Sequence, residues 1–143
     1  MATIKKYQER DKKAEYAYKF YLNKGYSPQA SASIVGNLIH EGALNTTAEG
    51  DKGYKGGSSR GIAQWREERL QKLQSMYGNK WTDFDNQLEF VDWELNNTHK
   101  SAGEALKRAN TVWEAGRIFT NEFEIPKVKF DEDNRRQKNV TDT

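Results

Sequence analysis

The stretch of sequence that decides the fold is Ser33-Ile-Val-Gly-Asn-Leu-Ile-His-Glu41-Gly42. Apolar side chains recur in it at helical spacing, so it predicts a helix that buries one face in a core. Ser27 and Pro28 come just before it and have the chemistry of an N-cap followed by the first helical position. The sequence therefore predicts a core helix that runs from Pro28 to about His40.

Glu41 lies where this helix meets a polar, glycine-rich stretch from Gly42 to Gly61. That stretch is too long for a simple connector and has the composition of turns and a hairpin. We expect the Glu41 carboxyl to be half packed against apolar side chains and half open to the loop, an environment that raises a carboxyl pKa. Because such a group donates a proton near neutral pH, we interpret Glu41 as a general acid.

Helical patterns account for most of the remaining chain, and capping boxes predict where two of the helices start. The fold class is mainly α, of α+β type, with a short irregular or β-hairpin excursion between the second and third helices. We expect one domain over residues 1–143, in which Trp81, Trp93 and Trp113 are core residues. The further expected helices are Lys5–Lys24, Glu67–Tyr77, Asp85–Asn96, those starting at Ser101-x-x-Glu104 and Thr111-x-x-Glu114, and a short docked helix in the tail after Pro126.

Composition excludes several classes of protein. The chain has 23 Lys and Arg against 21 Asp and Glu, a formal net charge of +2 without a basic run, so we expect no binding to nucleic acid. It has no cysteine, which rules out a disulfide framework and a thiolate metal site. The N-terminus lacks the apolar region of a signal peptide, and no apolar run reaches the roughly 20 residues of a membrane span. We therefore expect no membrane insertion.

The adjacent His40 and Glu41 do not make a zinc site. The metalloprotease pattern needs a second histidine four residues after the first, and Leu44 stands there; the only other histidine is His99. The glycines that follow the helix do not match a phosphate-binding loop, which precedes a helix. We expect neither a metal nor another cofactor.

Two carboxyl groups, one at a helix end and one in a hairpin, suit glycoside hydrolysis. Asp51 follows Glu41 by about ten residues and is the candidate for the second catalytic carboxylate, with Glu49 as a lesser one. Ser59 is a third catalytic candidate, because its hydroxyl could hold the attacking water. Each of these residues is also ordinary in a polar turn.

Three residues in or next to the glycine-rich stretch are candidates for binding a substrate. The Gln64 amide could bind the N-acetyl or hydroxyl groups of a sugar, or satisfy backbone groups at the start of the next helix. Trp65 could contact a sugar or belong to the core. Tyr54 lies in the hairpin itself.

These residues form a pattern that resembles the phage tail lysozyme family. In that family a helix with Val-x-Gly-Asn-Leu ends in a glutamate, and a Gly-Asp turn leads to Gly-Ile-x-Gln-Trp. The resemblance is specific over residues 30–66 and continues more weakly through Gln87–Val91 and Phe123-Glu124-x-Pro126 to Arg135-Arg136. The runs that carry it are Ile34–Asn45, Glu49-Gly50-Asp51 and Arg60–Arg66.

The resemblance implies an α-rich lysozyme fold that cleaves the β-1,4 bond between N-acetylmuramic acid and N-acetylglucosamine in peptidoglycan. Glu41 would be the catalytic acid, and Gln64 would line the sugar cleft beside Trp65. The partner is then a peptidoglycan glycan strand, and the protein is a monomer or a domain of a larger phage protein. Acting on the host cell wall without a signal peptide, it would be released through a holin or delivered by the virion.

Two alternatives stay open at this point. A lytic transglycosylase on the same fold would use a single glutamate as acid and then as base. A peptidoglycan-binding module of the virion would keep the fold without turnover.

Overall fold

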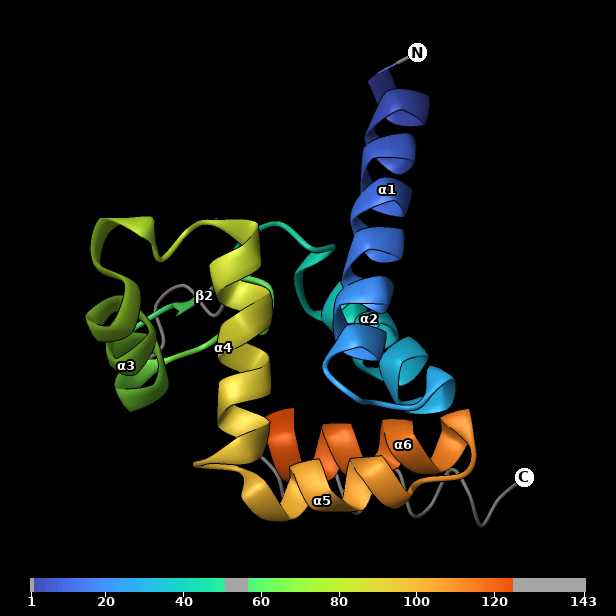
Figure 1. The fold of residues 1–143 in the computed structure, drawn as a ribbon. Helices are drawn as coiled ribbons and strands as arrows, with labels where there is room; N and C mark the ends of the chain where they lie inside the picture. Colours follow the sequence, from blue (N-terminus) through green and yellow to red (C-terminus); the bar gives the residue numbers. More distant parts are fainter. Residues whose placement is uncertain (1, 51–56, 125–143) are drawn as a thin grey trace, which may run out of the picture.

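The computed structural model describes residues 2–50 and 57–124. This part of the chain forms six α-helices, a two-stranded sheet, and two short helices of other types (Figure 1). The elements are α1 (Ala2–Asn23), α2 (Pro28–Gly42), β1 (Glu49–Gly50), β2 (Ser59–Arg60), α3 (Glu67–Tyr77), the 3-10 helix η1 (Gly78–Lys80), α4 (Phe84–Asn96), α5 (Lys100–Arg108), α6 (Val112–Ile118) and the π-helix η2 (Phe119–Glu124).

Helix α2 begins as the sequence predicted. The Ser27 hydroxyl accepts a hydrogen bond from the backbone N–H of Ala30 at 3.0 Å, and Pro28 is the first helical residue. The helix ends two residues later than expected, where Ala43 adopts a left-handed conformation with φ 54° and its N–H bonds to Ile39 O at 2.8 Å. Glu41 therefore lies inside the last turn of α2.

The sheet confirms the predicted hairpin between the second and third helices. Strands β1 and β2 are antiparallel, with Glu49 opposite Arg60 and Gly50 opposite Ser59. Asp51 and Tyr54 belong to the connection between the strands and lie outside the described residues.

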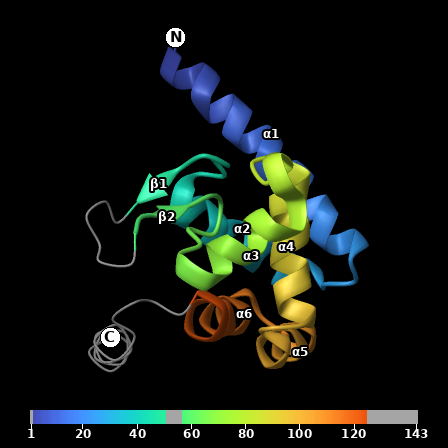
Figure 2. The ribbon, with the colours of Figure 1, turned by 90° about the vertical axis from the view of Figure 1, so that its left-hand side faces the viewer.

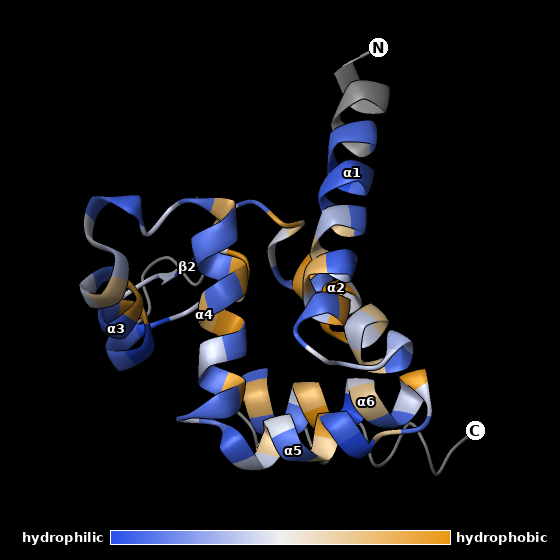
Figure 3. Ribbon diagram, in the orientation of Figure 1, coloured by the Kyte–Doolittle hydropathy of each residue, from blue (hydrophilic) through white to orange (hydrophobic). Residues whose placement is uncertain are grey.

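Helix α2 is the centre of the molecule. It packs against α1 on one side and against α6 on another, while α5 lies beside α4 and α6 (Figures 1 and 2). The N-terminal half of α1 projects away from the other helices (Figure 1), and hydrophobic residues gather where the helices meet (Figure 3). No helix in the described ranges combines the length and the apolar character that a membrane span needs.

Large aromatic side chains fill much of the core. Trp81 and Trp93 are partly buried against this core, but Trp113 is 67% exposed. The prediction for Trp113 was wrong because Ala115 and Ile118 form the buried side of α6. The fully buried aromatic residues are Tyr21, Trp65, Phe90, Phe119 and Phe123.

The two predicted capping boxes have different outcomes. Thr111 caps α6 through a hydrogen bond from the backbone N–H of Glu114, at 3.0 Å, as predicted. Ser101 is not a cap, because α5 starts at Lys100 and His99 occupies the N-cap position. The predicted helix end at Pro126 and the predicted tail helix lie outside the described residues.

Candidate active site

Glu41 is an exposed residue in the last turn of α2. The expected half-burial of its carboxyl group was therefore wrong. The end of α2 nevertheless lies close against the hairpin: a Cβ added to Gly42 would come within 3.2 Å of Ala48 Cβ and 3.5 Å of Gly61 O. Glycine at position 42 permits this approach, which places Glu41 at the junction between the central helix and the hairpin.

Ser59 and Gln64 bond to each other at the base of the hairpin. The Ser59 hydroxyl donates to Gln64 Oε1 at 2.8 Å, and Gln64 Nε2 donates to the carbonyl oxygens of Gly61 at 3.0 Å and Ala48 at 3.2 Å. Ser59 is buried, and Gln64 is half-buried with a positive φ of 54°. The Gln64 amide thus satisfies backbone groups, as one of the two predicted roles had it, but these groups belong to the hairpin region and not to the start of the next helix.

Trp65 lies in the core, the second of its two possible places. Its side chain is fully buried, its ring packs edge-on against Phe90 with centroids 5.4 Å apart, and Nε1 donates to Glu94 Oε1 at 2.8 Å. A ring in this position holds β2 and α3 against α4, away from any surface that a sugar could reach.

Gln87 on α4 bonds to the same region and was not among the site residues predicted from the sequence. Its Oε1 accepts from the N–H of Ile62 at 3.0 Å, and its Nε2 donates to Thr46 O at 2.9 Å and Trp81 O at 3.1 Å. One buried amide therefore joins both ends of the hairpin region to α4. The side chain is fully buried and fully bonded, so its role is positioning.

A buried ion pair lies where α3, α4 and η2 meet. Arg69 donates from Nε to Glu94 Oε2 at 2.7 Å, from Nη2 to Glu94 Oε1 at 2.8 Å, and from Nη1 to Phe123 O at 3.1 Å. The guanidinium carbon lies 4.7 Å from the centre of the Phe123 ring. The pair fastens η2, which follows α6, to the helices that come after the hairpin.

His99 borders this ion pair. Its Nδ1 is 4.0 Å from Glu94 Oε2, and its ring centroid is 5.4 Å from that of Phe123. Burial lowers the pKa of His99, the positive charge of Arg69 lowers it further, and Glu94 partly opposes both.

Glu124 is the carboxyl group that the sequence did not single out. It is half-buried, and its Oε1 atom is buried with no hydrogen-bond partner among the described residues. Burial raises the pKa of Glu124 well above its usual value, the negative charge of Glu41 raises it further, Arg69 lowers it, and Glu94 raises it. A second carboxyl group therefore acts electrostatically on the Glu41 end of α2.

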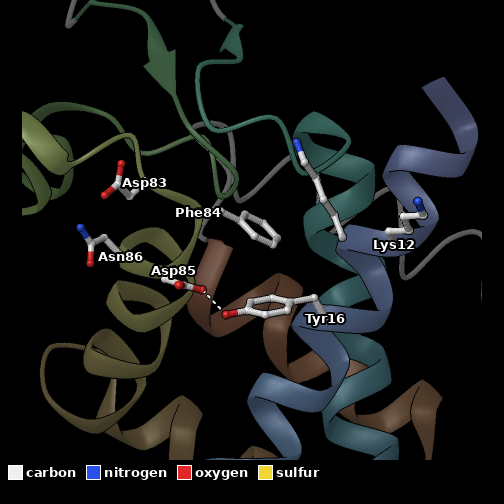
Figure 4. A pocket seen from close by; sticks show the side chains of 7 residues that line it. Lys12, Tyr16, Asp83, Phe84, Asp85 and Asn86 are labelled. Atoms are coloured by element: carbon white, nitrogen blue, oxygen red, sulfur yellow. Dashed lines mark hydrogen bonds between the residues drawn. The ribbon is translucent and has the colours of Figure 1, made fainter. Parts of the chain in front are cut away.

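A shallow groove elsewhere on the molecule contains none of these residues. It lies between α1 and the start of α4, where the Tyr16 hydroxyl bonds to Asp85 (Figure 4). Lys12 and Phe84 also line it. No group of three His, Cys, Asp or Glu side chains in the described part of the chain is placed to hold a metal ion.

The sequence pattern of the phage tail lysozyme family matches residues 12–141. The chain belongs to the phage tail lysozyme family. This confirms the resemblance of the α2 and hairpin motifs, and the match extends from the second half of α1 over all the later helices to η2. No curated protein matches the chain closely. Membership of the phage tail lysozyme family gives the protein a lysozyme-like role in the degradation of peptidoglycan.

Proposed function

We propose that the protein is a muramidase that hydrolyses the β-1,4 bond between N-acetylmuramic acid and N-acetylglucosamine, with Glu41 as the general acid. The observation that carries the proposal is the position of Glu41: an exposed carboxyl in the last turn of the central helix, directly beside the base of the hairpin. A glycan strand lying along this junction would bring its glycosidic oxygen within reach of the carboxyl.

In the proposed reaction, Glu41 donates its proton to the leaving oxygen while the C–O bond breaks and positive charge develops at the anomeric carbon. Asp51 directly follows β1 and is our candidate for the group that stabilises this charge or activates water. Ser59 is a weaker candidate, since it is buried and its hydroxyl donates a hydrogen bond to Gln64 Oε1. Tyr54 is proposed to contact the sugar.

Gln64 acts in this proposal mainly by holding the hairpin in place below the glycan. Its amide joins Ser59, Gly61 and Ala48, so the two sides of the hairpin base are held together. We propose that residues 1–143 work as one catalytic domain on the glycan strands of the host wall, reached through a holin or from the virion.

Digestion of purified peptidoglycan tests the reaction. The soluble fragments are separated and their masses measured: hydrolysis leaves a reducing N-acetylmuramic acid end, whereas a lytic transglycosylase leaves a 1,6-anhydro end that is lighter by one water. We expect reducing ends. Anhydro ends would assign the transglycosylase reaction, and the absence of any soluble fragment, with binding to the walls retained, would mark a peptidoglycan-binding module.

A further inference from the structure

Helix α2 and the α6–η2 segment run side by side in the same direction. The Ser33 hydroxyl donates to Val112 O at 2.7 Å near the start of the contact. Four residues further along each segment, a Cβ added to Gly116 would lie 4.0 Å from Asn37 Nδ2, and another four residues along the second segment Thr120 Oγ1 donates to Asn37 Oδ1 at 3.1 Å. The two segments are thus held together over several turns.

The next residues in this series are Glu41 on α2 and Glu124 on η2. Each lies four residues after a member of the Asn37–Thr120 hydrogen bond, which places both on the adjoining sides of their segments. The negative charge of Glu41 acts on Glu124, which agrees with this placement. One carboxyl of the two is exposed and the other is half-buried.

Among the residues that the structure describes, little stabilises the negative charge of Glu124. Arg69 on α3 is the cation that acts on it, but all three guanidinium nitrogens bond to Glu94 and to Phe123 O. Glu94 on α4 adds a further negative charge, and Glu41 on α2 adds another. His99 borders Glu94, and its lowered pKa keeps it uncharged near neutral pH.

We propose that Glu41 and Glu124 form a carboxyl pair that shares one proton near neutral pH, and that Glu124 is a positioning residue that keeps Glu41 supplied with it. This inference rests on the proposed role of Glu41 as the acid. Two neighbouring carboxyl groups cannot both ionise easily, because the first negative charge opposes the second. The pair then carries one proton and one negative charge over a range of pH that neither group would hold alone.

The buried member holds the proton while the site is empty, since burial disfavours its charged form more strongly. When a glycan covers Glu41, that carboxyl also loses contact with water, and the proton moves from Glu124 to Glu41. Glu41 passes it to the glycosidic oxygen, and the two groups are left ionised. The water that attacks the anomeric carbon releases one proton to the solvent. The carboxyl pair takes up one proton from the solvent and is thereby restored.

The pH dependence of wall digestion by Glu124→Gln tests this pair. Activity on the alkaline side follows the loss of the shared proton. Without the negative charge of Glu124 beside it, Glu41 loses its proton at lower pH, so the alkaline limb of Glu124→Gln should shift to lower pH. The ratio of wild-type to Glu124→Gln activity should then rise with pH, by up to about tenfold per pH unit between the two alkaline limbs. Glu122→Gln, an exposed position on the same turn, should superimpose on the wild type.

A titration of the side-chain carboxyl carbons by NMR gives a result that does not depend on activity. We expect one glutamate signal with a raised pKa, absent in Glu124→Gln and shifted to lower pKa in Glu41→Gln. The proposed pair would be overturned if the activity of Glu124→Gln were lower than that of the wild type by the same factor at every pH. It would also be overturned if the pKa of the Glu124 signal were unchanged in Glu41→Gln. If the titration shows the pair but the wild type digests no wall, the proposed function fails and the electrostatic coupling stands.

Discussion

Two glutamates lie near the end of η2, and the fold surrounds them in opposite ways. Glu94 on α4 accepts two hydrogen bonds from Arg69 and one from the Trp65 indole. Glu124 has a buried Oε1 without a hydrogen-bond partner in the described part of the chain, and its pKa is raised. Glu94 is fully buried and Glu124 is half-buried, and among the described residues only Glu94 is given the donors that a charged carboxylate needs.

The difference separates a structural carboxylate from one that can take part in proton transfer. Burying a charge is tolerated when it is paired and hydrogen-bonded, so Glu94 holds α3, α4 and η2 together as an anion. A buried carboxyl without such partners keeps its proton to a higher pH. Glu124, placed beside the Glu41 end of α2, therefore has a proton available where the proposed reaction uses one.

The largest effect on stability is expected for Glu94→Gln. The amide removes the negative charge and points an N–H₂ group toward donors, so the half-buried Arg69 loses its counter-charge. We expect a loss of about 3–5 kcal/mol in the free energy of unfolding, measured by urea denaturation. Glu89→Gln, an exposed position on the same helix, should change it by less than about 0.5 kcal/mol. Equal effects at the two positions would remove the distinction drawn for Glu94.

Arg69→Lys tests whether the fork of the guanidinium or only its charge matters. Lysine keeps the charge, but its one ammonium nitrogen cannot occupy the three positions from which the guanidinium nitrogens reach both Glu94 oxygens and Phe123 O. We expect a loss of about 1–3 kcal/mol, because acceptors in the ion pair lose donors. An unfolding free energy equal to that of the wild type would mean that charge alone holds this corner together.

Glu124→Gln should have a smaller effect on stability, with a sign opposite to that of Glu94→Gln at alkaline pH. The folded-state pKa of Glu124 lies above its usual value of 4.5, so the folded state holds this proton longer than the unfolded chain. The contribution of this protonated carboxyl to the free energy of unfolding is fully present below about pH 4.5 and is lost as the pH rises through the raised pKa. The Tm of Glu124→Gln should match the wild type near pH 4 and exceed it near pH 8. A Tm difference that is constant with pH would contradict this.

The smallest effect is expected for Trp113→Ser. The ring is mostly exposed, and the Arg117 guanidinium lies 5.6 Å from its centre. We expect a change of no more than about 0.5 kcal/mol in the free energy of unfolding. A loss comparable to that of Glu94→Gln would place Trp113 in the core after all, as the sequence first suggested.

The sequence predicts those parts of the fold that depend on neighbouring residues. The Ser27 cap, the Thr111 cap and the hairpin after α2 follow from local chemistry, and each is present. Ser101 failed as a cap because several residues near position 100 can start a helix and packing selects among them. The exposure of the Trp113 side chain was also decided by packing, since either face of so short a helix could have been buried.

The surroundings of the site carboxyls could not be predicted in the same way. Burial is the main cause of the raised pKa of Glu124; the charges of Glu41 and Glu94 raise it further and that of Arg69 lowers it. These three residues come from three other helices, and no periodicity in the sequence reports their meeting. The one signal was Phe123-Glu124-x-Pro126 within the weaker part of the family resemblance. Conversely, the motif located Glu41 at the end of α2 correctly, but the expected half-burial was found at Glu124 instead.

The most direct test of the central claim is the rate at which Glu41→Gln releases soluble fragments from purified peptidoglycan, compared with the wild type and with Glu122→Gln. Removal of a general acid lowers such rates by about 10²–10⁴-fold. We expect a loss of this size for Glu41→Gln, with the protein still folded at the assay temperature because the residue is exposed, and full activity for Glu122→Gln. Release by Glu41→Gln at the wild-type rate would show that Glu41 is not the acid.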